Sequence, residues 1–271
     1  MSTYLITGVS RGIGYGFLSN LSRNPENTVI GLARNQRATE EKVSKELGAR
    51  PNVHILQADM TNYDSILRAA KETEKITGGG LDYIIANAGV MSPSEAFANI
   101  GELAKDPKVF DDAFSYTMST NVIGNVYLFT SLMPLILKGK AKKVIAISSG
   151  VADIELLRKY DLELSPTYAA SKAALNAIVA KFSAQYAKDG VLVMSICPGM
   201  VDTQEFAGTT DEQKQKFGNF VQNLQRYAPH FTGPKTTESA VEDLLTVVGK
   251  SSVENGDGGS FVSQFGTKQW L

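Results

Sequence analysis

The sequence contains few of the residues that form cross-links or metal centres. It has one cysteine, Cys197, and two histidines, His54 and His230, among 271 residues. A lone cysteine excludes an internal disulfide and a cysteine-cluster metal site, and two histidines far apart in the chain do not make a metal site. Low cysteine usage is typical of a reducing compartment. We therefore expect a cytoplasmic protein with no bound metal.

An excess of charge of either sign is also absent. The chain has 27 basic and 28 acidic residues, a net charge of −1 and a pI near 6.2. This balance provides no electrostatic footprint for nucleic acid or for an anionic membrane surface. We expect neither as a partner.

Long apolar runs are missing too. The most apolar segment, 122–137, spans about 16 residues and is interrupted by Asn125 and Pro134, which makes it too short and too polar to cross a bilayer. The first residues lack the basic start and apolar core of a signal peptide. We expect a buried helix at 122–137.

The composition is that of an ordinary folded domain. Apolar residues make up 43% and charged residues 20% of the chain, which argues against disorder. The length allows one large α/β domain or two small ones. No composition shift marks a boundary, so we expect a single domain over residues 1–271.

A glycine-rich stretch near the start of the chain is the most informative local pattern. Residues 7–14, TGVSRGIG, follow the apolar run 4–6 and lead into apolar residues at helical spacing over 15–21. This order predicts a strand, a tight turn and a helix. Glycines let the backbone approach a ligand closely, and the N–H groups at the helix start attract a phosphate. By itself the pattern fits a plain tight turn about equally well.

Apolar runs and helical segments alternate along the rest of the chain. Strands are expected at 4–6, 28–33, 53–57, 81–86, 144–147, 191–196 and 259–262, and helices at 15–21, 36–47, 63–76, 108–137, 167–188 and 237–249. An irregular segment is expected at 151–166 and a helical substrate flap within 203–233. The alternation predicts a three-layer α/β fold, a Rossmann-like doubly wound parallel sheet of about seven strands with helices on both faces.

Two arginines bear on the choice of nicotinamide cofactor. In such folds an acidic residue near the end of the second strand binds the ribose 2′-hydroxyl, whereas a basic residue accommodates a 2′-phosphate. Here Ala33 and Arg34 occupy that place, and Arg11 lies within the glycine turn. Guanidinium groups bind phosphate in bidentate fashion. Each arginine alone fits a solvated surface charge, but the two together favour NADP over NAD.

Three residues form a candidate catalytic group. Tyr168 and Lys172 are four residues apart on an expected helix and so share one face, and Ser149 follows the neighbouring strand. An ammonium beside a phenol favours the phenolate and suits it to acid–base chemistry near neutral pH. A serine hydroxyl can hold a carbonyl oxygen as charge develops on it. Without the other motifs, the tyrosine–lysine pair would fit a surface helix pair better.

These motifs together resemble the short-chain dehydrogenase/reductase family over essentially the full chain. The glycine stretch matches the family's cofactor loop, Asn87-Ala88-Gly89 its structural turn, and Pro198-Gly199-x-Val201-x-Thr203 its nicotinamide-side loop. The catalytic tetrad is matched by Asn121, Ser149, Tyr168 and Lys172. Within the family the sequence resembles NADPH-dependent carbonyl reductases and fungal ketoreductases.

The resemblance implies a role for each tetrad position. Tyr168 would be the general acid toward a carbonyl or the base toward an alcohol, and Ser149 would orient the substrate oxygen. Lys172 would bind the nicotinamide ribose and keep the phenol acidic. Asn121 would hold a water that links Lys172 to solvent.

The resemblance also implies the cofactor site. NADP(H) would contact residues of the glycine loop, the strand ends and the nicotinamide-side loop. These are Gly8, Ser10, Arg11, Gly12, Ile13, Gly14, Arg34, Asp59, Met60, Asn87, Ala88, Gly89, Tyr168, Lys172, Pro198, Gly199, Val201 and Thr203.

The substrate side departs from the usual family pattern. The link from Ser149 to Tyr168 is longer than is common, so residues over 153–165 should lie at the substrate mouth. Candidate pocket or rim residues there are Ile154, Leu156, Leu157 and Tyr160. The flap carries Phe206, Phe217, Phe220 and Tyr227, which favour an apolar or aromatic substrate, although aromatics at this spacing are more often core. Trp270 would pack on its own subunit or near a partner's site.

The sequence therefore predicts an NADPH-dependent carbonyl reductase acting on a small-molecule carbonyl or alcohol. Family resemblance implies a homodimer or homotetramer formed through the helices at 108–137 and 167–188. Two alternatives stay open: a non-catalytic NADP-binding sensor on the same fold, and an oxidoreductase that acts on C=N or C=C bonds or oxidises an alcohol.

Overall fold

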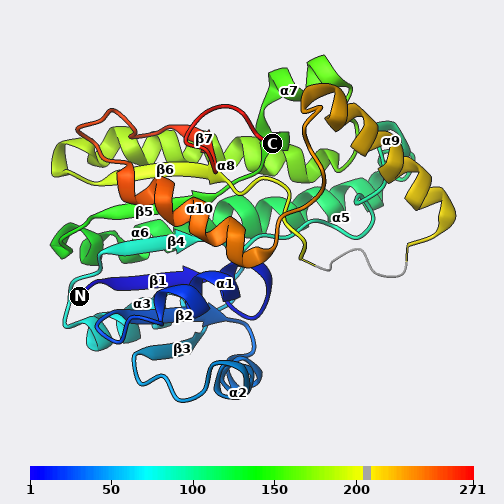
Figure 1. Cartoon of the computed structure of the whole chain (residues 1–271). Coiled ribbons are helices and arrows are strands. Elements are labelled where there is room, and N and C mark those ends of the chain that lie inside the picture. Colours follow the sequence, from blue (N-terminus) through cyan, green and yellow to red (C-terminus); the bar gives the residue numbers. More distant parts are fainter. Residues whose placement is uncertain (204–208) are drawn as a thin grey trace.

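A parallel β-sheet runs through the protein. The computed structural model describes residues 1–203 and 209–271, and in these residues it has seven strands in the order β3-β2-β1-β4-β5-β6-β7. Their bounds are β1 (Thr3–Thr7), β2 (Thr28–Ala33), β3 (Val53–Gln57), β4 (Tyr83–Ala86), β5 (Lys143–Ile147), β6 (Leu192–Cys197) and β7 (Phe261–Ser263). The predicted doubly wound parallel sheet is confirmed (Figure 1).

The chain reverses its direction of travel across the sheet at β1. From β1 it moves outward through β2 to β3, then returns to β4 on the other side of β1 and continues to β7. Ile6 of β1 accordingly pairs with Gly31 on one side and with Ile85 on the other. In open α/β sheets a ligand binds in the crevice at this switch point, beyond the carboxyl ends of the strands.

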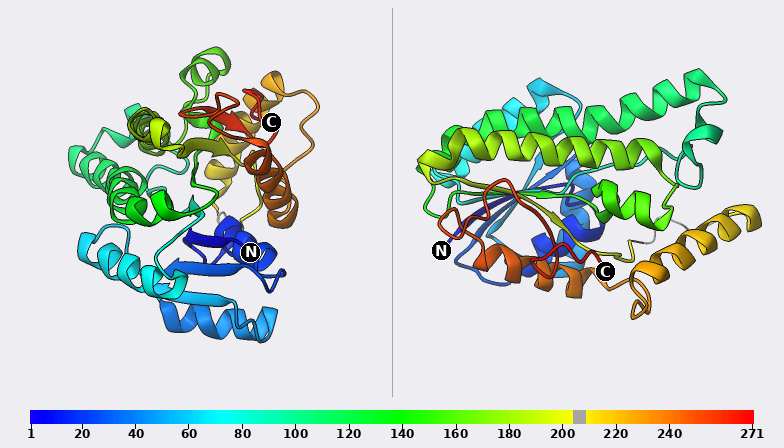
Figure 2. Two further views of the ribbon diagram at one scale, coloured as in Figure 1. Left: turned by 90° about the vertical axis from the view of Figure 1, so that its left-hand side faces the viewer. Right: turned by 90° about the horizontal axis from the view of Figure 1, so that it is seen from above.

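Helices cover both faces of the sheet, as Figure 2 shows. The helices are α1 (Gly12–Leu21), α2 (Gln36–Leu47), α3 (Tyr63–Thr77), α4 (Ile100–Leu103), α5 (Pro107–Met118), α6 (Gly124–Lys138), α7 (Ile154–Tyr160), α8 (Pro166–Tyr186), α9 (Asp211–Tyr227) and α10 (Thr237–Lys250). One buried apolar cluster joins the sheet to α3, α6 and α8, and another joins it to α1, α2 and α10. Strands buried on both faces account for the nearly unbroken apolar runs in the sequence.

Local side-chain bonds fix several helix ends that the sequence predicted well. Asn35 and Asn62 accept backbone N–H bonds at the starts of α2 and α3, and Gly78 ends α3 in the left-handed conformation. Asparagine N-caps and a C-terminal glycine are the usual boundary signals. This is why the observed bounds of these two helices agree with the expected ones to within one residue.

The helix expected at 108–137 differs in its middle. It runs from α5 into α6 through a π-helical turn, Ser119–Ile123, instead of continuing as one regular α-helix. The extra residue of such a turn changes which side chains face inward, and here Asn121 is fully buried. Gly124 follows, and an added Cβ there would lie only 2.4 Å from the carbonyl oxygen of Met60. The expected long helix is therefore present, with a π turn at its middle that the sequence did not predict.

Taken through its π turn, the helix Pro107–Lys138 is long and apolar enough to cross a membrane by length and composition alone. It is longer than the segment 122–137 that the sequence marked as too short. However, 61% of its most apolar window is buried inside the protein. A core helix packed against a sheet has the same properties.

The segment expected to be irregular, 151–166, contains α7. The Asp153 side chain accepts hydrogen bonds from the backbone N–H groups of Glu155 and Leu156, and the helix ends at Asp161 in the left-handed conformation. The expected flap, 203–233, contains α9, which begins with a capping box at Thr210. Phe206 lies outside the described residues. Together α7 and α9 stand beyond the carboxyl edge of the sheet (Figure 1).

Gly14 provides a test of the packing between α1 and the first turn. A Cβ at Gly14 would lie 2.3 Å from the carbonyl oxygen of Gly8, so Gly14→Ala should lower the free energy of unfolding by about 1–3 kcal/mol through overpacking. Gly249→Ala in α10 is the matched control, because no atom lies within 4 Å of its added Cβ. Urea unfolding of both variants checks this, and equal stability of Gly14→Ala and the parent would contradict it.

Candidate active site

Twelve of the eighteen cofactor residues predicted from the sequence line one cleft at the switch point of the sheet. Its volume is about 440 Å³. The predicted residues that line it are Gly8, Ser10, Arg11, Gly12, Ile13, Arg34, Asp59, Met60, Asn87, Ala88, Gly89 and Thr203. They come from the turns that follow β1, β2, β3 and β4 and from the loop after β6. The parallel sheet brings these turns to one edge.

Hydrogen bonds hold the glycine turn against the turn after β4. Asn87 Nδ2 donates to the carbonyl oxygen of Thr7 at 3.0 Å, and the backbone N–H of Ala88 donates to Thr7 Oγ1 at 2.8 Å. Gly8 and Gly12 have positive φ angles of 74° and 57°, where a side chain would be strained. Asn87 and Thr7 therefore shape the loop.

The start of α1 has the features of a phosphate site. Its N-cap residue, Arg11, has extended backbone and no side-chain cap bond to the helix N–H groups. N–H groups at such a helix start attract an anion. Gly14, predicted as a cofactor contact, does not line the cleft and instead packs beneath the carbonyl of Gly8.

Both candidate phosphate-binding arginines lie on the same cleft. Arg11 and Arg34 line it together with Asp59. Two hydrogen bonds from Thr61, first from its backbone N–H and second from its hydroxyl, lower the pKa of Asp59, and Arg34 lowers it further. The cleft thus places two cations near the Asp59 carboxylate, which already accepts two hydrogen bonds from Thr61.

A second cavity of about 690 Å³ adjoins the first and contains the chemistry-bearing residues. Ser149, Tyr168 and Lys172 line it, together with Pro198, Gly199, Val201 and Thr203. Ser149 follows β5, and the other two come from the first two turns of α8. The structure therefore brings together three of the four predicted catalytic residues and all four residues of the predicted nicotinamide-side loop.

Lys172 is a buried ammonium close to Tyr168. Its side chain donates from Nζ to the carbonyl oxygen of Ile147 at 2.8 Å, and Nζ lies 5.7 Å from the centroid of the Tyr168 ring. Burial lowers the pKa of Lys172 to about 8, and nearby Cys197 opposes this shift weakly. Burial also raises the pKa of the Cys197 thiol to about 11. Lys172 therefore stays mostly protonated at neutral pH, although its pKa is lowered toward that range.

Asn121 is placed differently from the other three. It is fully buried and lines none of these cavities. Its Nδ2 donates to the Val90 carbonyl at 2.8 Å and to Ser171 Oγ at 2.9 Å, and its Oδ1 accepts from the Val90 N–H at 2.8 Å. Asn121 thus fastens the loop after β4 to α8. Its expected contact with a relay water stays a prediction.

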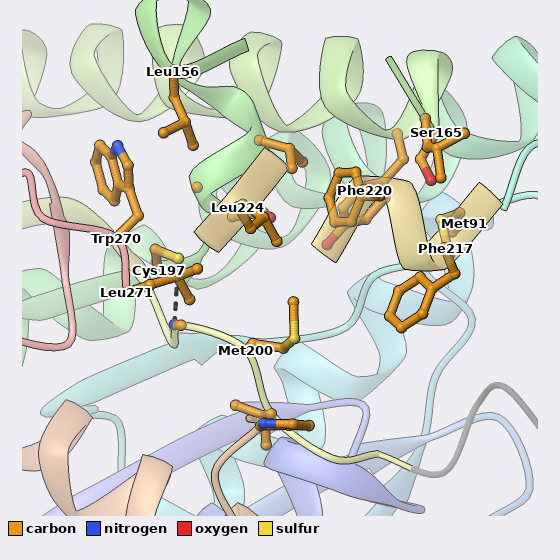
Figure 3. Close-up of a pocket in the computed structure, with 18 of the residues that line it drawn as sticks. Met91, Leu156, Ser165, Cys197, Met200, Phe217, Phe220, Leu224, Trp270 and Leu271 are labelled. Carbon is orange, nitrogen blue, oxygen red and sulfur yellow. Dashed lines mark hydrogen bonds between the residues drawn. The ribbon is translucent and has the colours of Figure 1, made fainter. Parts of the chain in front are cut away.

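A third cavity, of about 670 Å³ and mostly apolar, is lined in part by Ser149 and Tyr168. Figure 3 shows its apolar side, with Leu156, Phe220 and Trp270 labelled. Of the predicted substrate-side residues, Leu156, Phe217, Phe220 and Tyr227 line it. Leu157 and Tyr160 do not line it but pack against the apolar cluster that forms part of its wall, and Ile154 is 70% exposed and does not line it either. The α7 helix explains this, because only one of its faces can point to the cavity.

Several lining residues were missed from the sequence. Examples are Met91, Leu164, Met200, Leu224 and Leu271. Leu224 had a usable signal, since it follows Phe220 by one helical turn and shares its face. The others lie in loops or at the end of the described chain, where periodicity gives no information. Cys197 also lines the cavity, and its Sγ accepts from the Gly199 N–H (Figure 3).

Trp270 packs within its own chain and forms part of the cavity wall. Its ring stacks on Phe261 with centroids 4.3 Å apart, and Nε1 donates to Asp153 Oδ2 at 2.9 Å. Its backbone N–H donates to the Tyr227 hydroxyl at 2.7 Å. Trp270 therefore connects β7 to α7 and α9, three segments that are far apart in the sequence.

The fold and the site define a Rossmann-type oxidoreductase. A family model described as short chain dehydrogenase matches residues 2–214, and the chain belongs to this family. It is 49% identical to the short chain dehydrogenase virK of Hypocrea virens and 46% identical to the short-chain dehydrogenase/reductase iacC of Pestalotiopsis fici, in both cases over 100% of each chain.

A solved structure gives the same result for the fold. The NADPH-bound carbonyl reductase from chicken fatty liver is 25% identical to this chain, with a TM-score of 0.77 and 98% of each chain covered. The seven-stranded arrangement described above is therefore that of the family.

The depressed pKa of Lys172 predicts a pH-dependent stability. Lys172 titrates near pH 8 in the folded protein but near 10.5 when unfolded, so over this window the folded state binds fewer protons and gains stability as pH rises. Relative to Lys172→Met, the parent should gain about 2 kcal/mol of unfolding free energy between pH 7 and pH 10. Urea unfolding across this range measures it.

The control for this experiment is Lys181→Met, which removes an exposed lysine from the same helix. Its free energy of unfolding should stay within about 0.5 kcal/mol of the parent's, as for most surface substitutions. A difference between the parent and Lys172→Met that does not change with pH would contradict the assignment.

Proposed function

We propose that the protein binds NADP(H) and reduces a ketone or aldehyde to an alcohol. The observation that carries this is the position of Ser149 and Tyr168, which line both the cavity next to the cofactor cleft and the apolar cavity. A carbonyl group in the apolar cavity can therefore reach both hydroxyls at this boundary. Lys172 lies behind Tyr168, out of solvent.

The residues of the cleft fit a dinucleotide. The glycine turn, with its positive φ angles, leaves room at the start of α1, and the α1 N–H groups are suited to a pyrophosphate. Arg11 and Arg34 are placed for a 2′-phosphate. The NADPH in the chicken carbonyl reductase supports the same choice of cofactor. When bound, the nicotinamide supplies the hydride.

The chain's own residues then orient the substrate and move the proton. Ser149 Oγ donates a hydrogen bond to the carbonyl oxygen, and Tyr168 transfers its phenolic proton to that oxygen as charge develops on it. With a hydride supplied to the carbonyl carbon, this proton transfer would complete the alcohol and leave Tyr168 as a phenolate. The Lys172 ammonium stabilises that phenolate and is placed to return a proton to it.

The substrate class follows from the walls of the third cavity. Met91, Leu156, Phe220, Leu224 and Trp270 give it large apolar surfaces, and Ser149 and Tyr168 are among its few polar lining residues. Pockets of this kind orient an apolar ligand through a few polar contacts. We propose an apolar or aromatic carbonyl compound, with residues 203–233 acting as the substrate flap.

The α5–α6 helix has an exposed apolar surface that bears on the assembly of the protein. Val109, Phe114 and Ile123 are large apolar side chains that remain at least one-third exposed on the α5–α6 helix. They support a homodimer or homotetramer formed through this helix and α8.

The low cysteine content supports a cytoplasmic location.

Tyr168→Phe tests the proposed chemistry directly. Removing the phenolic proton should lower kcat for ketone-dependent NADPH oxidation by at least about 1,000-fold, while the Kd for NADPH stays within about 2-fold, because the ring is retained. Steady-state absorbance at 340 nm and fluorescence titration give the two numbers. Turnover retained in this variant would contradict the mechanism, whereas NADPH binding without turnover in the parent would favour the sensor alternative.

Arg34→Ala tests cofactor choice. Loss of a charged hydrogen bond to the 2′-phosphate should raise the Kd for NADPH about 10- to 100-fold and leave the Kd for NADH within about 2-fold. Arg37→Ala is the matched control, because Arg37 is exposed in the first turn of α2 and pairs with Glu41 at 2.9 Å. If Arg34→Ala and Arg37→Ala raise the Kd for NADPH by the same factor, Arg34 does not select the 2′-phosphate.

A further inference from the structure

Glu95 is a fully buried carboxylate in the loop that follows β4. Its Oε2 accepts from the backbone N–H groups of Thr167 at 2.7 Å and Tyr168 at 3.0 Å. Its Oε1 accepts from Thr167 Oγ1 at 2.7 Å and from the backbone N–H of Ser92 at 3.2 Å. Two of these four donors are the first N–H groups of the helix that carries the catalytic tyrosine.

The start of α8 requires such an acceptor from elsewhere in the chain. Its N-cap residue, Ser165, has a left-handed backbone with φ of 59° and makes no side-chain cap bond, and Pro166 at the first helical position has no N–H. The next two N–H groups, of Thr167 and Tyr168, would be unsatisfied without Glu95. A carboxylate there is also favoured by the positive end of the helix dipole.

The same loop forms part of the substrate side. Met91 and Ala96 line the apolar cavity with Tyr168. Ser165, just before α8, donates from its N–H to the Ala98 carbonyl at 3.3 Å and from its hydroxyl to the Ala96 carbonyl at 3.4 Å. Glu95 therefore lies at the centre of a set of contacts that fix the first turn of α8 relative to the cavity wall.

We propose that Glu95 is a positioning residue for Tyr168. It holds the tyrosine's own backbone N–H and that of the preceding residue, and so sets where the phenol stands relative to Ser149 and the bound carbonyl. The proposal rests on the reductase function proposed above. In catalysis a misplacement of about 1 Å can cost about 100-fold in rate, so a contact of this kind matters even though Glu95 touches neither substrate nor cofactor.

The number of acceptor sites explains why this position requires a carboxylate. Its two oxygens accept all four hydrogen bonds. Glutamine has a single oxygen, and its NH2 group would face either the two α8 N–H groups or the Thr167 and Ser92 donors. At least one buried backbone N–H then loses its acceptor, because the Thr167 hydroxyl is the only one of the four donors that can also accept. Glu95→Gln therefore disturbs the first turn with almost no change in side-chain volume.

The experiment compares Glu95→Gln with Glu163→Gln. Glu163 lies just before α8 but is exposed, so its variant removes the same type of charge without touching the cap. Glu95→Gln should lower kcat about 10- to 100-fold while KM for the ketone and Kd for NADPH stay within about 3-fold. Glu163→Gln should keep all three within about 2-fold. A purely structural role would instead move stability and both binding constants together.

A milder pair of variants covers the case in which Glu95→Gln does not fold. Thr167→Val removes one of the four donors, and Thr167→Ser keeps it. Thr167→Val should lower kcat about 3- to 10-fold, and Thr167→Ser should restore it to within about 2-fold of the parent. Equal kcat values for Thr167→Val and Thr167→Ser would count against the proposal.

Amide hydrogen exchange tests the role of Glu95 independently of the reductase function. In Glu95→Gln the amides of Thr167 and Tyr168 should exchange at least about 10-fold faster than in Glu163→Gln, whether or not a substrate is known. If the parent reduces no carbonyl in a broad panel, the reductase function fails and exchange alone decides the role of Glu95. Unchanged exchange, or a folded Glu95→Gln protein with parental kcat, would overturn the proposal.

Discussion

Burial of the Lys172 ammonium is the constraint around which the candidate active site is organised. A charged group out of water is costly unless it has partners, and the partner seen here is the carbonyl of Ile147 at the end of β5. This contact is available because β5 ends at the carboxyl edge of the sheet, where Lys172 of α8 reaches its last carbonyl. The parallel sheet therefore determines both the position of the lysine and the lowering of its pKa.

The helix α8 is held at several points so that this arrangement stays fixed. Apolar side chains such as Leu175 and Val179 bury one face against the sheet. Asn121 fastens Ser171 to the loop after β4, and Glu95 holds the first turn. The polar contacts surround the catalytic turn, while the apolar ones anchor the rest of the helix. Hydrogen bonds are directional and fix the orientation of the catalytic turn, whereas apolar packing stabilises the rest of the helix.

The sequence alone predicted the sheet, most helices and most of the cofactor cleft. Runs such as 28–33 and 53–57 are apolar because both faces are buried, and Asn35 and Asn62 mark helix starts by local chemistry. The π turn at Asn121, the cap by Glu95 and the wall formed by Trp270 could not be predicted in this way. Each depends on a contact between segments far apart in the chain, and neither spacing nor propensity records such contacts. The α7 helix was not predicted, although Asp153 at its N-cap is a local signal for a helix start.

The hydrogen bonds that join Trp270 to Asp153 and Tyr227 have a consequence for how the substrate preference of this protein can evolve. Asp153 lies outside the lining of the apolar cavity, yet it holds the indole that forms one of the walls. Replacing Asp153 would reshape the cavity while leaving every residue at the reacting centre unchanged. A change of substrate preference can therefore begin at Asp153, which is not a catalytic residue, without the loss of any catalytic side chain.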